Sequence, residues 1–93
     1  MYNSCRIEYD PLKNRINWEK HGVIFSDVEN VFTDPLALTI EDREHAEQRW
    51  ITLGMDGLGR IVVVVYTWRG HAIRIVSARR ASCSERRRYE ERL

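Results

Sequence analysis

The sequence has few cysteines and no long run of apolar residues. Its two cysteines, Cys5 and Cys83, are too few and too far apart to indicate a metal site or a disulfide framework, so we expect each to be a small buried hydrophobe. No stretch approaches the roughly 20 apolar residues that a membrane-spanning helix needs, and the first residues do not follow the pattern of a signal peptide. These absences predict a cytoplasmic protein without a membrane segment.

The chain also lacks the motifs of several kinds of enzyme. No spacing of histidines, cysteines or carboxylates is typical of a metal site, no glycine-rich loop is present to hold a phosphate, and no serine is placed as an evident nucleophile. We therefore expect neither a metal nor another cofactor. With 93 residues, of which 43% are hydrophobic, the chain fits one domain, residues 1–93, with a single core.

Charge is distributed unevenly along the chain, although the net charge is only +1. Residues 69–93 contain eight arginines and three glutamates, which gives this segment a charge of about +5. Residues 26–48 contain seven carboxylates and a single arginine. One basic and one acidic region indicate that a polyanion binds on one side and a cationic partner on the other.

The first third of the sequence predicts a short strand over residues 6–9 and a helix over residues 11–21. Asp10-Pro11 is typical of a helix start, and Gly22 is well placed to end the helix in a left-handed conformation. Leu12 and Ile16 form a thin apolar stripe that we expect to face the core.

A second helix is expected from Ser26 onward, because residues 26–29 (Ser-Asp-Val-Glu) have the pattern of a capping box. It ends at Asp34-Pro35, since the residue before a proline avoids helical geometry. Its expected buried residues are Val28, Val31 and Phe32.

From residue 36 onward the pattern predicts four antiparallel strands and a last helix. Apolar residues alternate over residues 36–40 and 49–55, the unbroken apolar run 61–66 is typical of a central strand, and residues 71–79 form the last strand. Ile51, Leu53 and Met55 are expected to face the core, and both glycines of the turn at residues 56–59 to have positive φ. A capping box at residues 82–85 begins the last helix. The prediction is an α+β fold, a curled antiparallel sheet with two N-terminal helices and one C-terminal helix.

Arginines of the last strand are candidate ligands for phosphate. Arg74 lies between two isoleucines and points away from them, and Arg79 and Arg80 lie at the end of the strand. Planar guanidinium groups match the geometry of phosphate oxygens. An arginine whose stem packs on a solvated sheet face explains Arg74 equally well.

Lys20 and His21 lie at the end of the first helix. A histidine there often only stabilises the helix dipole, but an imidazole can also accept or donate a proton near neutral pH. An arginine-rich protein without a metal could cleave RNA through the neighbouring 2′-hydroxyl, which needs a proton acceptor, a proton donor and positive charge on the phosphorane. Composition alone favours the alternative that the arginines merely bind backbone phosphates.

Four segments resemble the BrnT toxins in the same order along the chain. They are residues 9–13 (Tyr-Asp-Pro-Leu-Lys), 17–25 (Asn-Trp-Glu-Lys-His-Gly-Val-Ile-Phe), 32–35 (Phe-Thr-Asp-Pro) and 74–80 (Arg-Ile-Val-Ser-Ala-Arg-Arg), followed by Glu85-Arg86 and Tyr89. The resemblance implies a RelE-like ribonuclease fold and the toxin half of a type II toxin–antitoxin pair, which cleaves RNA and arrests translation. The implied partner is a BrnA-like ribbon-helix-helix antitoxin that binds operator DNA.

The resemblance also implies the residues of a site. Lys20 and His21 would lie near the scissile group, with Arg74 and Arg79 on the phosphate. The implied RNA-binding residues are Tyr9, Arg60, Arg80, Arg86 and Tyr89. The family usually has tryptophan in place of Tyr9, and tyrosine keeps an aromatic face for stacking. The alternative is a catalytically inactive toxin homologue that acts as a co-repressor with the antitoxin on operator DNA.

Overall fold

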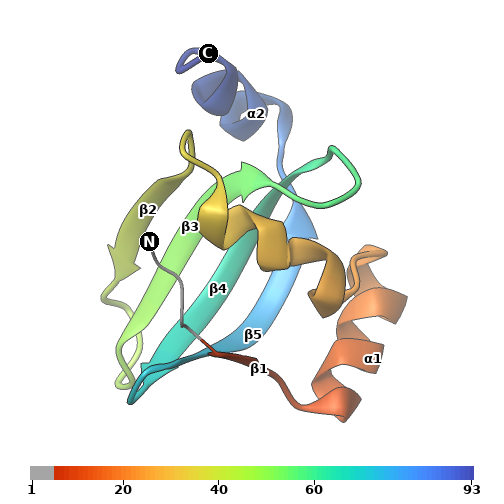
Figure 1. Ribbon diagram of the computed structural model, residues 1–93, viewed down its shortest axis with the longest axis vertical. Helices are drawn as coiled ribbons and strands as arrows, with labels where there is room; N and C mark the ends of the chain where they lie inside the picture. The colour runs from red at the N-terminus through yellow and green to blue at the C-terminus, as the bar shows by residue number, and fades with distance from the viewer. Residues whose placement is uncertain (1–5) are drawn as a thin grey trace.

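The computed structural model describes residues 6–93, which form a five-stranded sheet with two α-helices and one 3-10 helix (Figure 1). The elements are β1 (Arg6–Glu8), α1 (Pro11–His21), the 3-10 helix η1 (Phe25–Thr33), β2 (Leu38–Asp42), β3 (Arg49–Met55), β4 (Ile61–Arg69), β5 (Ala72–Arg80) and α2 (Cys83–Glu90). The strand order is β1-β5-β4-β3-β2, so the apolar run of β4 is central, as predicted. The α+β class is confirmed.

The sheet is mixed, and the prediction of a wholly antiparallel sheet is wrong. Strands β2 to β5 form an antiparallel meander, but β1 pairs in parallel with β5 and places Glu8 beside Arg74. A strand of three residues carries no sequence signal of its direction. Strand β5 also contains a bulge at Val76, because Val65 pairs with Ser77 and Tyr66 with Ile75.

Each face of the sheet has its own apolar cluster. The helix η1 crosses one face (Figure 1), where its buried Val28 and Val31 join a cluster that includes Val64 of β4. On the other face Leu53 and Val63 pack with Tyr89 of α2. The helix α2 extends beyond the end of the sheet where β5 finishes, and α1 lies beside β5 (Figure 1). Both helices therefore flank the same end of β5.

Helix α1 has the predicted bounds, but the side chain that it buries is polar. Asp10 accepts a hydrogen bond from the amide of Leu12 (2.9 Å), and Gly22 follows the helix with φ 69°. The predicted stripe of Leu12 and Ile16 is 63% and 50% exposed, whereas Asn17 is only 5% exposed. The expectation that the stripe faces the core is wrong, because Asn17 makes the attachment to the sheet instead.

Asn17 hydrogen-bonds to the backbone on both sides of it. Its Nδ2 donates to the carbonyls of Val23 (2.9 Å) and Ala78 (2.8 Å), and its Oδ1 accepts from the amide of Ala78 (3.0 Å). A strand edge has unpaired backbone groups that need partners. Asn17 thus completes the hydrogen bonding of β5 where β1 no longer covers its edge.

The second helix differs in type and start from the prediction. The cap of η1 is Ile24, without a side-chain hydrogen bond, so the expected capping box at Ser26 is wrong. The amide of Phe25 is bound by Asn14 Oδ1 (2.8 Å) and its ring is fully buried, which starts the helix earlier. Strand β2 starts at Leu38, two residues late, because Asp34 Oδ1 accepts from the amide of Leu36 (2.9 Å) in a turn.

Three smaller expectations are also wrong. In the turn between β3 and β4 only Gly59 has positive φ (80°), while Gly57 lies so close to Asn30 that a side chain there would clash. Met55 is exposed at the strand end instead of facing the core. Cys83 is exposed at the start of α2, and Cys5 lies outside the described residues. Within residues 6–93 no helix is both long and apolar enough to cross a membrane.

Candidate functional site

A hollow between α1 and β5 contains two of the predicted site residues. Lys20 and His21, in the last turn of α1, line a cavity of about 250 Å³ together with Val76 and Ser77 of β5. Both side chains are exposed. Because Asn17 fixes the helix against β5, the hollow has a defined width. The structure therefore brings Lys20 and His21 to the edge of the sheet.

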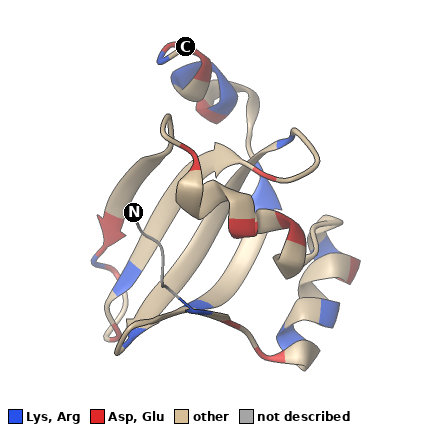
Figure 2. Ribbon diagram, viewed as in Figure 1, with Lys and Arg blue, Asp and Glu red and all other residues tan. Residues whose placement is uncertain are grey.

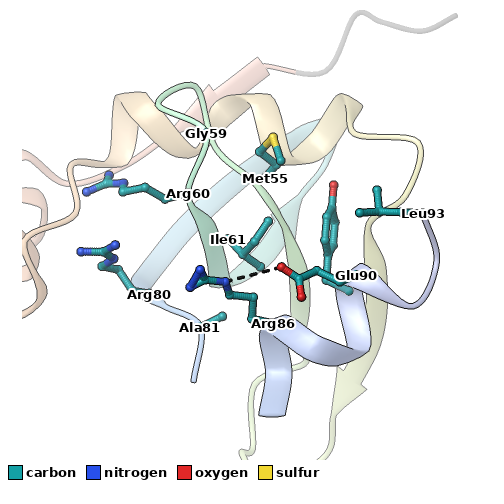
Figure 3. A pocket seen from close by; sticks show the side chains of 10 residues that line it. Met55, Gly59, Arg60, Ile61, Arg80, Ala81, Arg86, Glu90 and Leu93 are labelled. Carbon is teal, nitrogen blue, oxygen red and sulfur yellow. Dashed lines mark ion pairs between the residues drawn. The ribbon is translucent and has the colours of Figure 1, made fainter. Parts of the chain in front are cut away.

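A second cavity, of about 270 Å³, collects four of the five predicted RNA-binding residues (Figure 3). We call it the α2 cavity, because it lies where α2 meets the ends of the strands. Its lining residues are Met55, Gly59, Arg60, Ile61, Arg80, Ala81, Arg86, Tyr89, Glu90 and Leu93.

Arg60 connects the α2 cavity to the end of α1. Its Nε donates to Asp56 Oδ2 (2.8 Å) and its Nη1 donates to the carbonyl of Gly22 (3.2 Å), the residue after His21. The Asp56 side chain is fully buried and also accepts from the amides of Leu58 and Arg60. The guanidinium is thus held in a fixed orientation next to the hollow that His21 lines.

Arg79 is paired with a glutamate of α2. Its Nη1 and Nη2 each donate to one oxygen of Glu85, both at 2.8 Å. This bidentate bond, with the amide of Ser82, lowers the pKa of Glu85 to about 2, and the same bond to Glu85 raises the pKa of Arg79. Ser82 and Glu85 form the predicted capping box. Arg79 therefore fixes the start of α2 against the end of β5.

Arg74 and Tyr9 lie apart from these groups. Arg74 pairs across the sheet with Thr67, and its Nη1 is 3.9 Å from Glu8. Arg79 is five positions farther along β5, a distance of roughly 16 Å. The ring of Tyr9 packs edge-on against Phe25 at the opposite end of α1 from His21, with centroids 5.5 Å apart. Neither residue lines the two cavities.

Tyr89 contributes to the α2 cavity from a buried position. Its hydroxyl donates to Asp34 Oδ2 (2.7 Å), and burial together with this bond raises the pKa of Tyr89 to about 12. Asp34 also accepts from the amides of Leu36 and Met55; although burial opposes its charge, these bonds and the Tyr89 bond lower its pKa. The sequence identified Asp34 only as a helix end, because nothing in the local pattern indicates a partner 55 positions away.

Charged residues separate only partly in space. Lysines and arginines lie on α1, on α2 and at the end of β5, and carboxylates lie on η1 and at the end of β2, but α1 and α2 also contain carboxylates (Figure 2). Sequence analysis did not identify Asp56, Glu90 or Asn17; the Asp-Gly pair at residues 56–57 signals a turn, but not the buried ion pair. In residues 6–93 no three histidine, cysteine or carboxylate side chains form a cluster that could hold a metal ion.

The sequence and the fold both match ribonuclease toxins. Residues 9–85 match the family described as "Ribonuclease toxin, BrnT, of type II toxin-antitoxin system". The crystal structure of the Brucella abortus ribonuclease toxin BrnT matches with a TM-score of 0.68 and 26% sequence identity, covering 85% of this chain and 99% of that chain. No match is found among curated proteins.

These comparisons define the class of the protein as a toxin of a type II toxin–antitoxin system that acts as a ribonuclease. Within this class, the chain belongs to the BrnT family, because the family match spans most of its length. The resemblance noted in the sequence is confirmed.

Proposed function

We propose that this protein is a metal-independent endoribonuclease, in which the 2′-hydroxyl of RNA attacks the adjacent phosphate. One observation carries the proposal beyond family membership: Lys20 and His21 share a hollow at the edge of β5, and Arg60 is fixed within hydrogen-bond distance of the residue after His21. An imidazole and guanidinium groups can supply the proton transfers and positive charge that the phosphorane needs. The products would be a 2′,3′-cyclic phosphate and a 5′-hydroxyl.

The positions of the side chains favour a division of roles. His21 transfers protons, since an imidazole can both accept and donate near neutral pH, and Lys20 supplies charge beside it. Arg79 contacts the phosphate from the end of β5 while Glu85 holds it in place. Arg74, farther along the same strand, contacts the RNA backbone away from the cleaved bond.

We also propose a biological setting, which membership of a toxin–antitoxin family supports. Residues 1–93 act as one toxin domain in the cytoplasm, related to RelE-like ribonucleases, and RNA cleavage arrests translation. A ribbon-helix-helix antitoxin binds over the basic end of the sheet, and the complex binds operator DNA. Protection of Arg74 and Arg79 from an arginine-specific reagent in the complex would support this arrangement, and unchanged reactivity would contradict it.

The central test is cleavage of end-labelled RNA in the presence of a chelator. The wild-type protein should turn over many RNA molecules, and His21→Ala and Lys20→Ala should each lower the rate by roughly a hundredfold or more. Arg15→Ala is the matched control, since Arg15 is an exposed cation of the same helix, paired only with Glu19, and does not line the hollow.

Two outcomes would contradict different parts of the proposal. Cleavage that stops in chelator and returns with added Mg²⁺ would overturn the metal-independent mechanism. Full activity of both folded variants would place the reaction elsewhere on the protein.

A further inference from the structure

The lining of the α2 cavity differs from one end to the other. Arg60 and Arg80 lie at one end, Arg86 and Glu90 lie at the other, and apolar residues lie between them. Met55, Ile61 and Ala81 provide apolar surface between the strand ends and α2. Arg60 and Arg80 extend side by side in the same direction, whereas Arg86 and Glu90 lie on the side of α2 (Figure 3). A nucleotide has a matching arrangement, because its charged phosphate is linked through the sugar to a flat base with hydrogen-bonding groups.

The side chains at the cavity have hydrogen-bonding capacity that the protein does not use. Within residues 6–93, the Arg80 side chain makes no hydrogen bond or ion pair, and the carboxylate of Glu90 accepts no hydrogen bond. The ion pair between Arg86 Nε and Glu90 Oε2 is long, at 3.7 Å. The Nη2 of Arg60 is buried without a partner, while its Nε and Nη1 are bound. Arg80 therefore offers a cation for a phosphate, and Glu90, which is paired with Arg86 only at 3.7 Å, offers an acceptor for a base.

The volume restricts the occupant to something small. A cavity of about 270 Å³ lies just below the usual range of pockets for drug-sized ligands, and so suits a single nucleotide better than a folded RNA element. Bases of single-stranded RNA are read by stacking on aromatic rings or guanidinium planes and by hydrogen bonds to their Watson–Crick edges. The guanidinium of Arg86 offers a surface for stacking, and Glu90 offers hydrogen-bond acceptors.

The carboxylate of Glu90 can distinguish between the four bases. An ionised carboxylate has two acceptor oxygens and no donor. Guanine presents two neighbouring donors on its Watson–Crick edge, N1–H and the N2 amino group. Adenine and cytosine present one amino group beside a ring nitrogen acceptor, and uracil presents one N–H between two carbonyls. Only guanine can bond both oxygens of Glu90.

We propose that the α2 cavity binds a guanine nucleotide of the RNA substrate, with Glu90 on the base and Arg60 and Arg80 on the phosphate. The inference rests on the proposed ribonuclease function and deepens it. Because Arg60 also contacts the carbonyl after His21, the bound guanosine lies beside the cleaved bond. The cavity would thus set the sequence preference of cleavage.

The test is the binding of the four nucleoside monophosphates to the intact chain, measured by calorimetry and by the backbone NMR shifts of Ile61 and Ala81. Guanosine monophosphate should bind about tenfold more tightly than the other three, the discrimination expected of one bidentate contact. Glu90→Gln should remove this preference, because an amide offers one acceptor and one donor. Glu91→Gln is the matched control, since Glu91 is an adjacent glutamate that does not line the cavity.

Equal binding of all four nucleotides, or an unchanged guanine preference in Glu90→Gln, would overturn the inference. Mapping of the cut sites separates it from the proposed function. Cleavage of RNA without a guanine next to the cut would contradict the cavity assignment and leave the ribonuclease intact. Guanosine monophosphate binding by a protein that cleaves no RNA would support the cavity and contradict the ribonuclease.

Discussion

Asn17 shows how a single polar residue determines the geometry of the candidate site. It lies in the middle of a helix whose larger apolar residues are half exposed, and its amide bonds both backbone groups of Ala78. Apolar periodicity gives no weight to a buried asparagine, and it indicated the exposed stripe of Leu12 and Ile16 instead. The bounds of α1 could be predicted from Asp10 and Gly22, but its contact with β5 could not, because the partner is 61 positions away.

Asn17→Ala should therefore destabilise the protein more than Ile16→Ala does. The first change leaves buried backbone groups of β5 without partners and should cost about 3 kcal/mol. Ile16 is half exposed, so its truncation should cost less than about 1 kcal/mol. Urea denaturation of both variants would measure the difference, and equal losses would show that Asn17 does not attach the helix.

At the scale of elements, α2 is attached to the sheet at its first turn. The capping box of residues 82–85 was predictable because all its members are local in sequence. The pairing of Glu85 with Arg79 was not, since it depends on how the strand end meets the helix. The parallel pairing of β1 with β5 also depends on residues that are distant in sequence. The three residues of β1 therefore predicted a strand but not its partner.

The ion pair predicts a specific acid sensitivity. The pKa of Glu85 is about 2 in the folded protein against an ordinary 4.5, so the folded state binds its proton less readily than the unfolded state. Its contribution to the free energy of unfolding is complete above about pH 4.5 and disappears as the pH falls towards 2. Glu85→Gln should flatten the fall in stability over this interval, whereas Glu91→Gln should retain it. Parallel wild-type and Glu85→Gln profiles in urea titrations would contradict the assignment.

At the scale of the whole molecule, basic and acidic residues are partly separated: η1 contains carboxylates but no lysine or arginine, whereas α1 and α2 contain both kinds (Figure 2). This separation could be predicted from composition along the chain. The grouping of Arg60, Arg80 and Arg86 around one cavity could not be predicted from the sequence. These arginines come from three separate places, the residue before β4, the end of β5, and α2. Arg74, which the strand pattern placed with Arg79, lies beside Glu8 instead.

RNA affinity should depend on salt through the proposed RNA-binding arginines, including Arg80 at the end of β5. Each phosphate contact that a variant loses should reduce the slope of log K against log salt by about 0.7 for a single strand. Arg80→Ala should show this reduction, while Arg43→Ala, in the acidic region and paired with Glu41, should not. Filter binding at several salt concentrations would measure both slopes. Equal slopes for Arg80→Ala and wild type would remove Arg80 from the RNA surface.

The parallel pairing of β1 with β5 also bears on when the proposed site can form during synthesis of the chain. Arg6 of β1 pairs with Ala72, and Asn17 hydrogen-bonds to Ala78. The edge of the sheet is therefore complete only after both residues of β5 have been synthesised. Lys20 and His21 are synthesised early. The hollow that they line is formed only when β5, which contributes Ser77, has left the ribosome. The proposed cleavage site is therefore incomplete until β5 has been synthesised, and a chain that terminates before β5 would lack it.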